Sequence, residues 1–297
     1  MLEPHMETVN GCEFWMLPVE GGVFDMGDEY GDLLKSCRPV HQVRVSDFYL
    51  GKYPVAQALW RAVVQAESVG ETQSHPDTSL NPNPSYFQGD DLPVEQVSWD
   101  DAQLFIKKLN ELTESTRLPG YVYRLPREAE WEYAARLPAE ASKAGSPAVV
   151  SMAGLPTETM KAISPAEETK AGAGKFHAEG YKYSGSDCLK DVGWFNDNSG
   201  STTKPVGQKY PNQLGLYDMS GNVWEWCEDW YDSEYYEACN KKGIVENPIG
   251  PEKGTGRVRC GGSWPNEARY CRVAYRSGYW PDCRYHDIGF RLALSLQ

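Results

Sequence analysis

The stretch at residues 97–113, VSWDDAQLFIKKLNELT, shows the clearest folding pattern in the sequence. Ser98 stands just before the apolar residues begin, as an N-cap, and Asp101 follows three residues later, as in a capping box. The apolar residues repeat at intervals of three and four, which is the spacing of one helix face. That face is formed by Ala102, Phe105, Ile106 and Leu109. The pattern predicts an amphipathic helix with a fixed start.

Short strands and further helices are predicted around this stretch. GGVFDMG at 21–27 and HQVRVSDFYLGKYPV at 41–55 alternate in the way half-buried strands do. Helix patterns follow in VAQALWRAVVQA at 55–66 and, after Pro126, in YRLPREAEWEYAARL at 123–137. From residue 179 onward the chain is rich in Trp, Tyr, Gly and Asn, with short strand signals and many loops. The predicted class is α+β, with two main helices, short strands and many loops.

Length and composition indicate a single domain over 1–297. Hydrophobic residues make up 40% of the 297 residues, enough for a sizeable core. Small residues dominate at about 137–178, and we interpret this segment as an insertion because it lacks the bulky side chains of a second core.

Charge and hydropathy exclude several classes of partner. The net charge of −13 argues against nucleic acid and against anionic membrane surfaces. No apolar run reaches the ~18 residues of a membrane helix. The first residues contain no signal-peptide core. If they are a cloning remnant, a native signal segment is absent from this chain.

The cysteines and histidines form no recognisable metal motif. None of the eight cysteines lies in a CxxC spacing, and free thiols are favoured over a disulfide framework in a chain of this size. The five histidines are isolated from one another. A histidine-bound zinc or iron site is therefore not expected.

Six motifs occur in a fixed order along the chain. They are GGVFDMG at 21–27, LPVEQVSWDDAQLF at 92–105, YRLPREAEWEYAAR at 123–136, KPVGQKYPNQLGLYDMSGNVWEWCEDWY at 204–231, RVRCGGSW at 257–264 and IGFRLAL at 288–294. This ordered set resembles the formylglycine-generating-enzyme family, also called sulfatase-modifying factors. The resemblance covers nearly the whole chain apart from 137–178, and it implies a variant of the C-type lectin fold.

The resemblance does not extend to the catalytic cysteines. The family's enzyme uses two cysteines with four residues between them, just after the GGS motif, which bind copper as thiolates or exchange disulfides. Here only Cys271 lies in that interval, and Asn266 stands where the first cysteine would be. We therefore predict no enzymatic activity and no copper. The alternative is an oxidase or oxygenase of the same type with altered ligands.

The segment at 264–288 resembles the variable region of proteins diversified by retroelements, such as the variable protein of Treponema. Two classes of residue alternate in it. The frame would consist of GGSW at 261–264, residues 271–274, Arg276, Pro281, Arg284 and IGFRLAL at 288–294. The ligand-binding positions would be Pro265, Asn266, Glu267, Arg269, Tyr270, Tyr275, Ser277, Gly278, Tyr279, Trp280, Asp282, Cys283, Tyr285, His286 and Asp287. Most of these types are reachable from an Asn codon by changing adenines, whereas Glu267 and Trp280 need other template codons.

These residue types are also those of binding surfaces. Tyr and Trp supply rigid contact area, while Ser, Asn, Asp and Gly supply adaptable hydrogen bonds. We expect Tyr270, Tyr275, Tyr279, Trp280 and Tyr285 to be exposed, and Trp264 to be core. The ligand would be a protein or another macromolecule. The resemblance implies a cell-surface or otherwise extracytoplasmic location.

A calcium site is implied for the motif LYDMSGNVWEW at 216–226. In the family, side chains at the positions of Asp218 and Glu225, with backbone carbonyls at those of Gly221 and Val223, hold a metal. Oxygen ligands from a tight glycine turn suit this hard cation. Two interpretations stay open: a structural calcium ion, or two carboxylates that accept backbone N–H groups in a loop.

Two acidic clusters are interpreted as structural. Glu128 and Glu132 share a helix face with Arg124 and Arg136, so an ion-pair ladder is favoured over acid–base catalysis. The pair at 90–91 follows a glycine in a polar loop and indicates a solvated turn.

Overall fold

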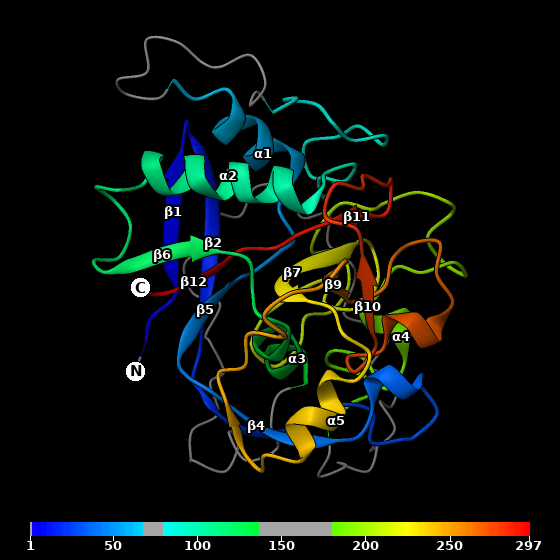
Figure 1. Cartoon of the computed structure of the whole chain (residues 1–297). Coiled ribbons are helices and arrows are strands. Elements are labelled where there is room, and N and C mark those ends of the chain that lie inside the picture. The colour runs from blue at the N-terminus through cyan, green and yellow to red at the C-terminus, as the bar shows by residue number, and fades with distance from the viewer. Residues whose placement is uncertain (1, 68–79, 137–179) are drawn as a thin grey trace, which may run out of the picture.

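The computed structural model describes residues 2–67, 80–136 and 180–297. The insertion predicted at 137–178 lies outside the described residues. Three sheets and a few helices confirm the α+β class (Figure 1).

The largest sheet brings the two ends of the chain together. Figure 1 shows the blue N-terminal strands and the red C-terminal strand in one layer. Its order is β1 (His5–Val9), β2 (Cys12–Val19), β5 (Phe48–Gly51), β12 (Ala293–Leu296) and β6 (Tyr121–Arg124). The first two strands were not predicted, because their apolar residues do not alternate regularly; in β2 four of the eight residues are half-buried.

Two smaller sheets complete the framework. One has the order β10 (Arg276–Tyr279), β9 (Arg257–Cys260), β7 (Trp224–Trp230) and β11 (Ile288–Gly289). The other has the order β3 (Gly22–Met26), β4 (His41–Val45) and β8 (Val245–Glu246). Strands β3, β4 and β5 fall in the regions predicted from their alternation.

Helices α1 (Gln57–Val64) and α2 (Trp99–Leu112) pack together beside the largest sheet (Figure 1). The capping box of α2 is confirmed: the Asp101 N–H donates to Ser98 Oγ at 3.0 Å, and the Ser98 N–H donates to Asp101 Oδ2 at 2.9 Å. The predicted apolar face is also confirmed, with Ala102, Phe105, Ile106 and Leu109 all buried.

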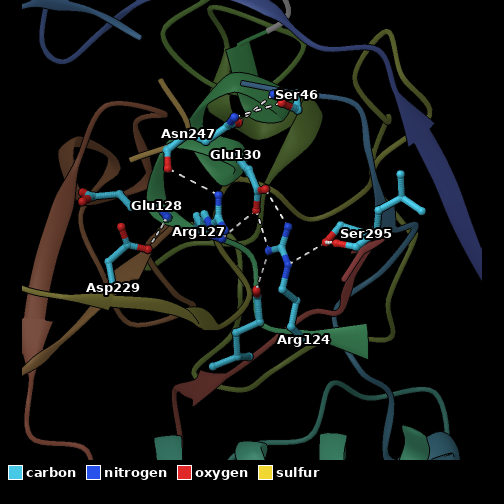
Figure 2. Close-up of polar contacts among 10 residues, drawn as sticks. Ser46, Arg124, Arg127, Glu128, Glu130, Asp229, Asn247 and Ser295 are labelled. Atoms are coloured by element: carbon cyan, nitrogen blue, oxygen red, sulfur yellow. Dashed lines mark hydrogen bonds and ion pairs between the residues drawn. The ribbon is translucent and has the colours of Figure 1, made fainter. Parts of the chain in front are cut away.

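Helix α3 (Glu128–Arg136) lies in the interior, with every residue buried. Glu130 accepts two hydrogen bonds from Arg124, at 2.6 and 2.7 Å, and one from the Arg127 N–H (Figure 2). Asp229 accepts the Glu128 N–H at 2.8 Å (Figure 2). The structural role predicted for these acids is confirmed, although only Glu132 and Arg136 pair along the helix.

The remaining helical segments are short. They are η1 (Lys35–Cys37), α4 (Leu189–Val192), α5 (Tyr235–Asn240) and η2 (Ala268–Cys271). No helix in the described ranges is long and apolar enough to span a membrane.

Candidate ligand-binding surface

The segment at 264–288 is a long excursion from the sheet formed by β10, β9, β7 and β11. It leaves after β9, passes through η2, returns as β10 antiparallel to β9, and loops again to β11. Its end is held by β7, because Ile288 pairs with Trp224 in parallel register. Fixed strands therefore support both ends of the segment.

Three arginines of the predicted frame tie this segment to distant elements. Arg276 is buried and forms a two-pronged ion pair with Glu128 of α3, with Nη2 at 2.9 Å from Oε2. Arg272 pairs with Asp32, and Arg284 pairs with Asp101 at 2.6 and 2.7 Å. Planar guanidinium–carboxylate pairs fix both distance and orientation. The excursion is therefore held in place at three separate points.

The apolar part of the frame is equally fixed. Cys271 is fully buried in a cluster with Leu189, Val192 and Phe195. Gly262 has a φ of +69°, and a Cβ there would meet Cys271 Sγ at 2.7 Å. Only glycine allows this approach. Burial raises the pKa of the Cys271 thiol to about 12, so the thiolate that nucleophilic or metal chemistry requires is suppressed.

Aromatic side chains between the frame residues reach the surface. Trp280 is 58% exposed and Tyr285 is 43% exposed. Tyr279, half-buried, makes edge-to-face contacts with both, at ring-centroid distances of 5.4 and 5.3 Å. Five further predicted positions are exposed or half-buried at the rim: Pro265, Glu267, Arg269, Asp282 and Cys283.

Two predicted ligand-binding positions belong to the frame instead. Tyr275 is only 7% exposed, because its ring packs against Trp224 at 5.9 Å and Tyr270 at 5.0 Å. The predicted exposure of Tyr275 is therefore wrong. At Gly278 a Cβ would meet Tyr231 at 2.4 Å, so this position has no room for a side chain. Tyr270 is half-buried, as is Ser277.

The inner edge of the surface is polar. Ser263 Oγ lies 2.7 Å from Asn266 Oδ1 and 2.9 Å from Asp287 Oδ2. Trp264, predicted as core, is half-buried, and its Nε1–H donates to the His286 carbonyl at 3.1 Å. Asn266, at the position that would hold the first catalytic cysteine, is thus hydrogen-bonded to Ser263 beside the half-buried indole of Trp264.

Sequence reasoning missed three residues that contribute to this surface from outside the segment. Tyr86 is 70% exposed, and its ring lies 6.0 Å from that of His286. The neighbouring Phe87 packs edge-on against Trp264 at 5.6 Å. The third missed residue is Arg259 on β9, which lies under Tyr279. No periodic pattern marks these residues, since they lie in a polar loop and on a short strand.

The residues of the implied calcium site lie together at one turn. Asp218 and Glu225 are buried, and so are Gly221 and Val223. Both oxygens of Glu225 accept from Arg291, each at 2.6 Å, and Oε2 also accepts from Trp131 Nε1 at 2.6 Å. Asp218 Oδ2 accepts the Gly207 N–H at 2.7 Å.

The charges at this turn do not balance. One guanidinium, that of Arg291, faces two buried carboxylates, which leaves one negative charge over. Burial accordingly raises the pKa of Asp218 to about 6. A cation at Asp218 would neutralise this surplus, whereas both oxygens of Glu225 already accept hydrogen bonds from Arg291 and Trp131. No group of three or more His, Cys, Asp or Glu suited to a metal occurs in the described part of the chain.

Comparison with known proteins places the chain in a family. Residues 8–296 match the model of the sulfatase-modifying factor enzyme 1-like domain. The chain belongs to this sulfatase-modifying factor family. Its fold is the C-type lectin type expected for the formylglycine-generating enzymes, as the solved structures of the family confirm.

The relatives of this sulfatase-modifying factor chain differ in function. It is 29% identical to the formylglycine-generating enzyme of Thermomonospora curvata, over 94% of this chain and 92% of the relative. It is 27% identical to the chaperone protein LppX of Paenibacillus barcinonensis, over 93% and 88%. Among solved structures, Treponema denticola variable protein 1 is 28% identical, covers 99% of both chains and superposes with a TM-score of 0.69. The family therefore contains an enzyme, a chaperone and a variable protein.

Proposed function

We propose that this chain is a non-enzymatic binding protein and that residues 264–288 carry its ligand-binding surface. The surface is formed by Tyr279, Trp280 and Tyr285, with Tyr86 at its edge, over a frame that other elements hold fixed. We define these four aromatic residues as the display cluster. Its ligand is a protein or another macromolecule, because the aromatic area is broad and lies at the surface.

One observation carries the proposal. Within this single segment the frame side chains are buried or ion-paired with distant elements, while two of the aromatic residues between them, Trp280 and Tyr285, are exposed. Exposure of large aromatic side chains to water is unfavourable, and contact with another surface removes that cost. A rigid support under an exposed aromatic cluster is the arrangement of a binding surface.

We also propose that this chain lacks the oxidase or oxygenase activity of the alternative interpretation. The enzyme of this family needs two cysteines, and here Asn266 and the buried Cys271 stand at those positions. Support comes from the raised pKa of Cys271 and from the apolar side chains that enclose it. A thiol with a raised pKa is mostly protonated at neutral pH, which disfavours both metal binding and attack on a disulfide.

The test is an assay of the purified chain with a cysteine-containing sulfatase peptide, with and without copper. No formylglycine is expected in either condition. Turnover that disappears in Cys271→Ser would overturn the non-enzymatic assignment. A Cys283→Ser variant is the matched control, because Cys283 lies at the rim and has no place in the family's cysteine pair.

We further propose that the segment is diversified by a retroelement and that the protein is displayed at the cell surface. The likeness to a variable protein and the alternation of frame and display residues support diversification. Coding sequences from independent isolates should differ at Tyr279, Trp280, Tyr285 and the rim but not at Tyr86, Tyr275, Gly278 or the frame arginines. Differences spread evenly over 257–297 would contradict diversification.

Calcium is proposed as a structural ion at Asp218 and Glu225, with the carbonyls of Gly221 and Val223 as the other ligands. The surplus buried negative charge supports this proposal. The ion would supply positive charge to a closed turn.

A further inference from the structure

Arg259 lies beneath the display cluster and has no anionic partner. It projects from β9, where Val258 and Cys260 on either side are buried. Its guanidinium carbon lies 4.7 Å from the ring centre of Trp224 and 4.7 Å from that of Tyr279. Its Nε is buried and makes no hydrogen bond. In the described ranges, no hydrogen bond or ion pair involves the Arg259 side chain.

The other arginines of this surface are all paired. Arg276 binds Glu128, Arg272 binds Asp32, Arg284 binds Asp101, and Arg269 contacts Glu267 at 3.2 Å. A partly buried guanidinium loses hydration, and an opposite charge normally restores that free energy. Arg259 instead has only the faces of two aromatic rings, and burial lowers its pKa. Four arginines of the segment, Arg269, Arg272, Arg276 and Arg284, have acidic partners, and Arg259 has none within ion-pair distance.

Arg257 provides an internal comparison. It lies two residues earlier on the same face of β9, and its guanidinium carbon is 3.7 Å from the ring centre of Trp99 and 3.5 Å from that of Trp230. Its Nη1 donates to the Glu228 carbonyl at 2.7 Å. Arg257 therefore joins α2 to β7 as a structural residue. Arg259 has similar stacking but lacks a comparable acceptor.

Three tyrosines around Arg259 would assist anion binding, whereas the nearby carboxylate of Asp287 would oppose it. Tyr275, Tyr279 and Tyr285 lie close enough to influence its charge, and so does Asp287. Asp287 makes no ion pair with it and instead accepts from Ser263. Phenol hydroxyls donate hydrogen bonds to an oxyanion, and the planar guanidinium presents two parallel N–H groups that match a carboxylate.

We propose that Arg259 is the fixed anion-binding centre of the display surface, and that it receives the carboxylate of an acidic side chain from a protein ligand. This inference rests on the proposed binding function. Arg259 lies outside 264–288, so the acidic contact would stay the same while the residues around it change. Diversification would then alter the neighbours of the acidic side chain and leave the requirement for an acid in place.

The first arm of the test uses acetate as the probe. The Nε–Hε resonance of Arg259, assigned by its loss in Arg259→Gln, is followed by NMR in the full chain as sodium acetate is added. We expect a saturable shift that sodium chloride at equal ionic strength does not produce. The resonance of Arg257 should stay in place. Equal shifts at the two arginines, or none at Arg259, would overturn the proposal.

The second arm uses a random dodecapeptide library displayed on phage and selected on the wild-type chain. Selected peptides should be enriched in Asp and Glu. Arg259→Gln should weaken their binding by about tenfold to a hundredfold, the value of a charged hydrogen bond. Arg259→Lys should recover part of this loss, because it keeps the charge without the planar fork. Arg257→Gln is the matched control and should change binding less than about threefold.

The outcomes separate this inference from the binding function. Peptides that lose binding in Trp280→Ala and Tyr285→Ala but show no acidic enrichment and no response to Arg259→Gln would overturn the role of Arg259 alone. If no selected peptide responds to Trp280→Ala or Tyr285→Ala, the display surface itself is wrong. Thermal melts of each variant establish that the loss of binding does not come from unfolding.

Discussion

Arg276 and Trp280 are four positions apart and experience opposite environments. Arg276 is buried, and its charge is matched by Glu128 from a helix far away in the sequence. Trp280 is among the most exposed large side chains of the described chain. The difference shows that the segment is not a uniform loop. The frame residues contact the protein interior, whereas the exposed residues they support contact little of the interior. Substitutions at frame positions should therefore lower the free energy of unfolding far more than substitutions at exposed positions.

The largest effect is expected at the buried ion pair. Arg276→Met leaves Glu128 charged and unpaired in the interior, which should lower the free energy of unfolding by about 3–5 kcal/mol. Arg284→Ala breaks the half-exposed pair with Asp101 and should cost at most about 1 kcal/mol. Urea denaturation measures both. Adding Glu128→Gln to Arg276→Met should restore much of the loss, and equal losses in the two single variants would contradict a buried frame.

The next effect is at Tyr275, which the structure moves from the surface to the frame. Tyr275→Ala should cost about 3 kcal/mol or more, because truncating a buried aromatic ring leaves a cavity. Phe290→Ala, at a fully buried position, is the positive control. A loss below about 0.5 kcal/mol, the usual range of surface substitutions, would return Tyr275 to the display positions.

A pH effect is expected at the buried Asp218, one of the residues of the proposed calcium site. Its folded pKa of about 6 lies above the ordinary value of 3.8, so between these values the folded state holds a proton that the unfolded state has lost. Stability should therefore fall as pH rises from about 4 to 6, by up to about 3 kcal/mol without calcium. Asp218→Asn should flatten this slope. Urea midpoints across pH, compared between wild type and variant, measure it.

Calcium binding provides a second test of the site at Asp218. Above pH 6, where Asp218 is charged, EDTA should lower the melting temperature and calcium should restore it, since binding to the folded state alone adds RT ln(1 + [L]/Kd). At a hundredfold excess over Kd this amounts to about 2.7 kcal/mol. An unchanged melting temperature across millimolar calcium would leave the two carboxylates as acceptors of hydrogen bonds only.

The smallest effect is expected at the display cluster. Trp280→Ala and Tyr285→Ala should each change the free energy of unfolding by no more than about 0.5 kcal/mol, because little buried area is lost. Tyr210→Ala, at another highly exposed aromatic residue away from the segment, is the control. Losses of several kcal/mol at Trp280 or Tyr285 would show that the cluster is core, and the binding surface would have to be abandoned.

Local patterns determined part of this architecture from the sequence. The capping box of α2 and its apolar face were predictable, because a cap and a helix period involve only neighbouring residues. Ile288, Phe290 and Leu292 are apolar and buried, but the structure buries Arg291 between them as well, beside Glu225. A charged residue in the interior is invisible to hydropathy until its partner is known.

The sequence also determined the family and the alternation of frame and display residues through its ordered motifs. Only the tertiary structure decided which aromatic residues are exposed. Tyr275 and Trp280 look alike in sequence, and they differ because Trp224 from β7 covers the first and nothing covers the second. The tertiary structure likewise decided that Gly278 has no room beside Tyr231, and that the Arg259 side chain stacks on two rings without a hydrogen-bond or ion-pair partner in the described part of the chain. Those outcomes depend on contacts between residues distant in the chain, which short-range patterns do not encode.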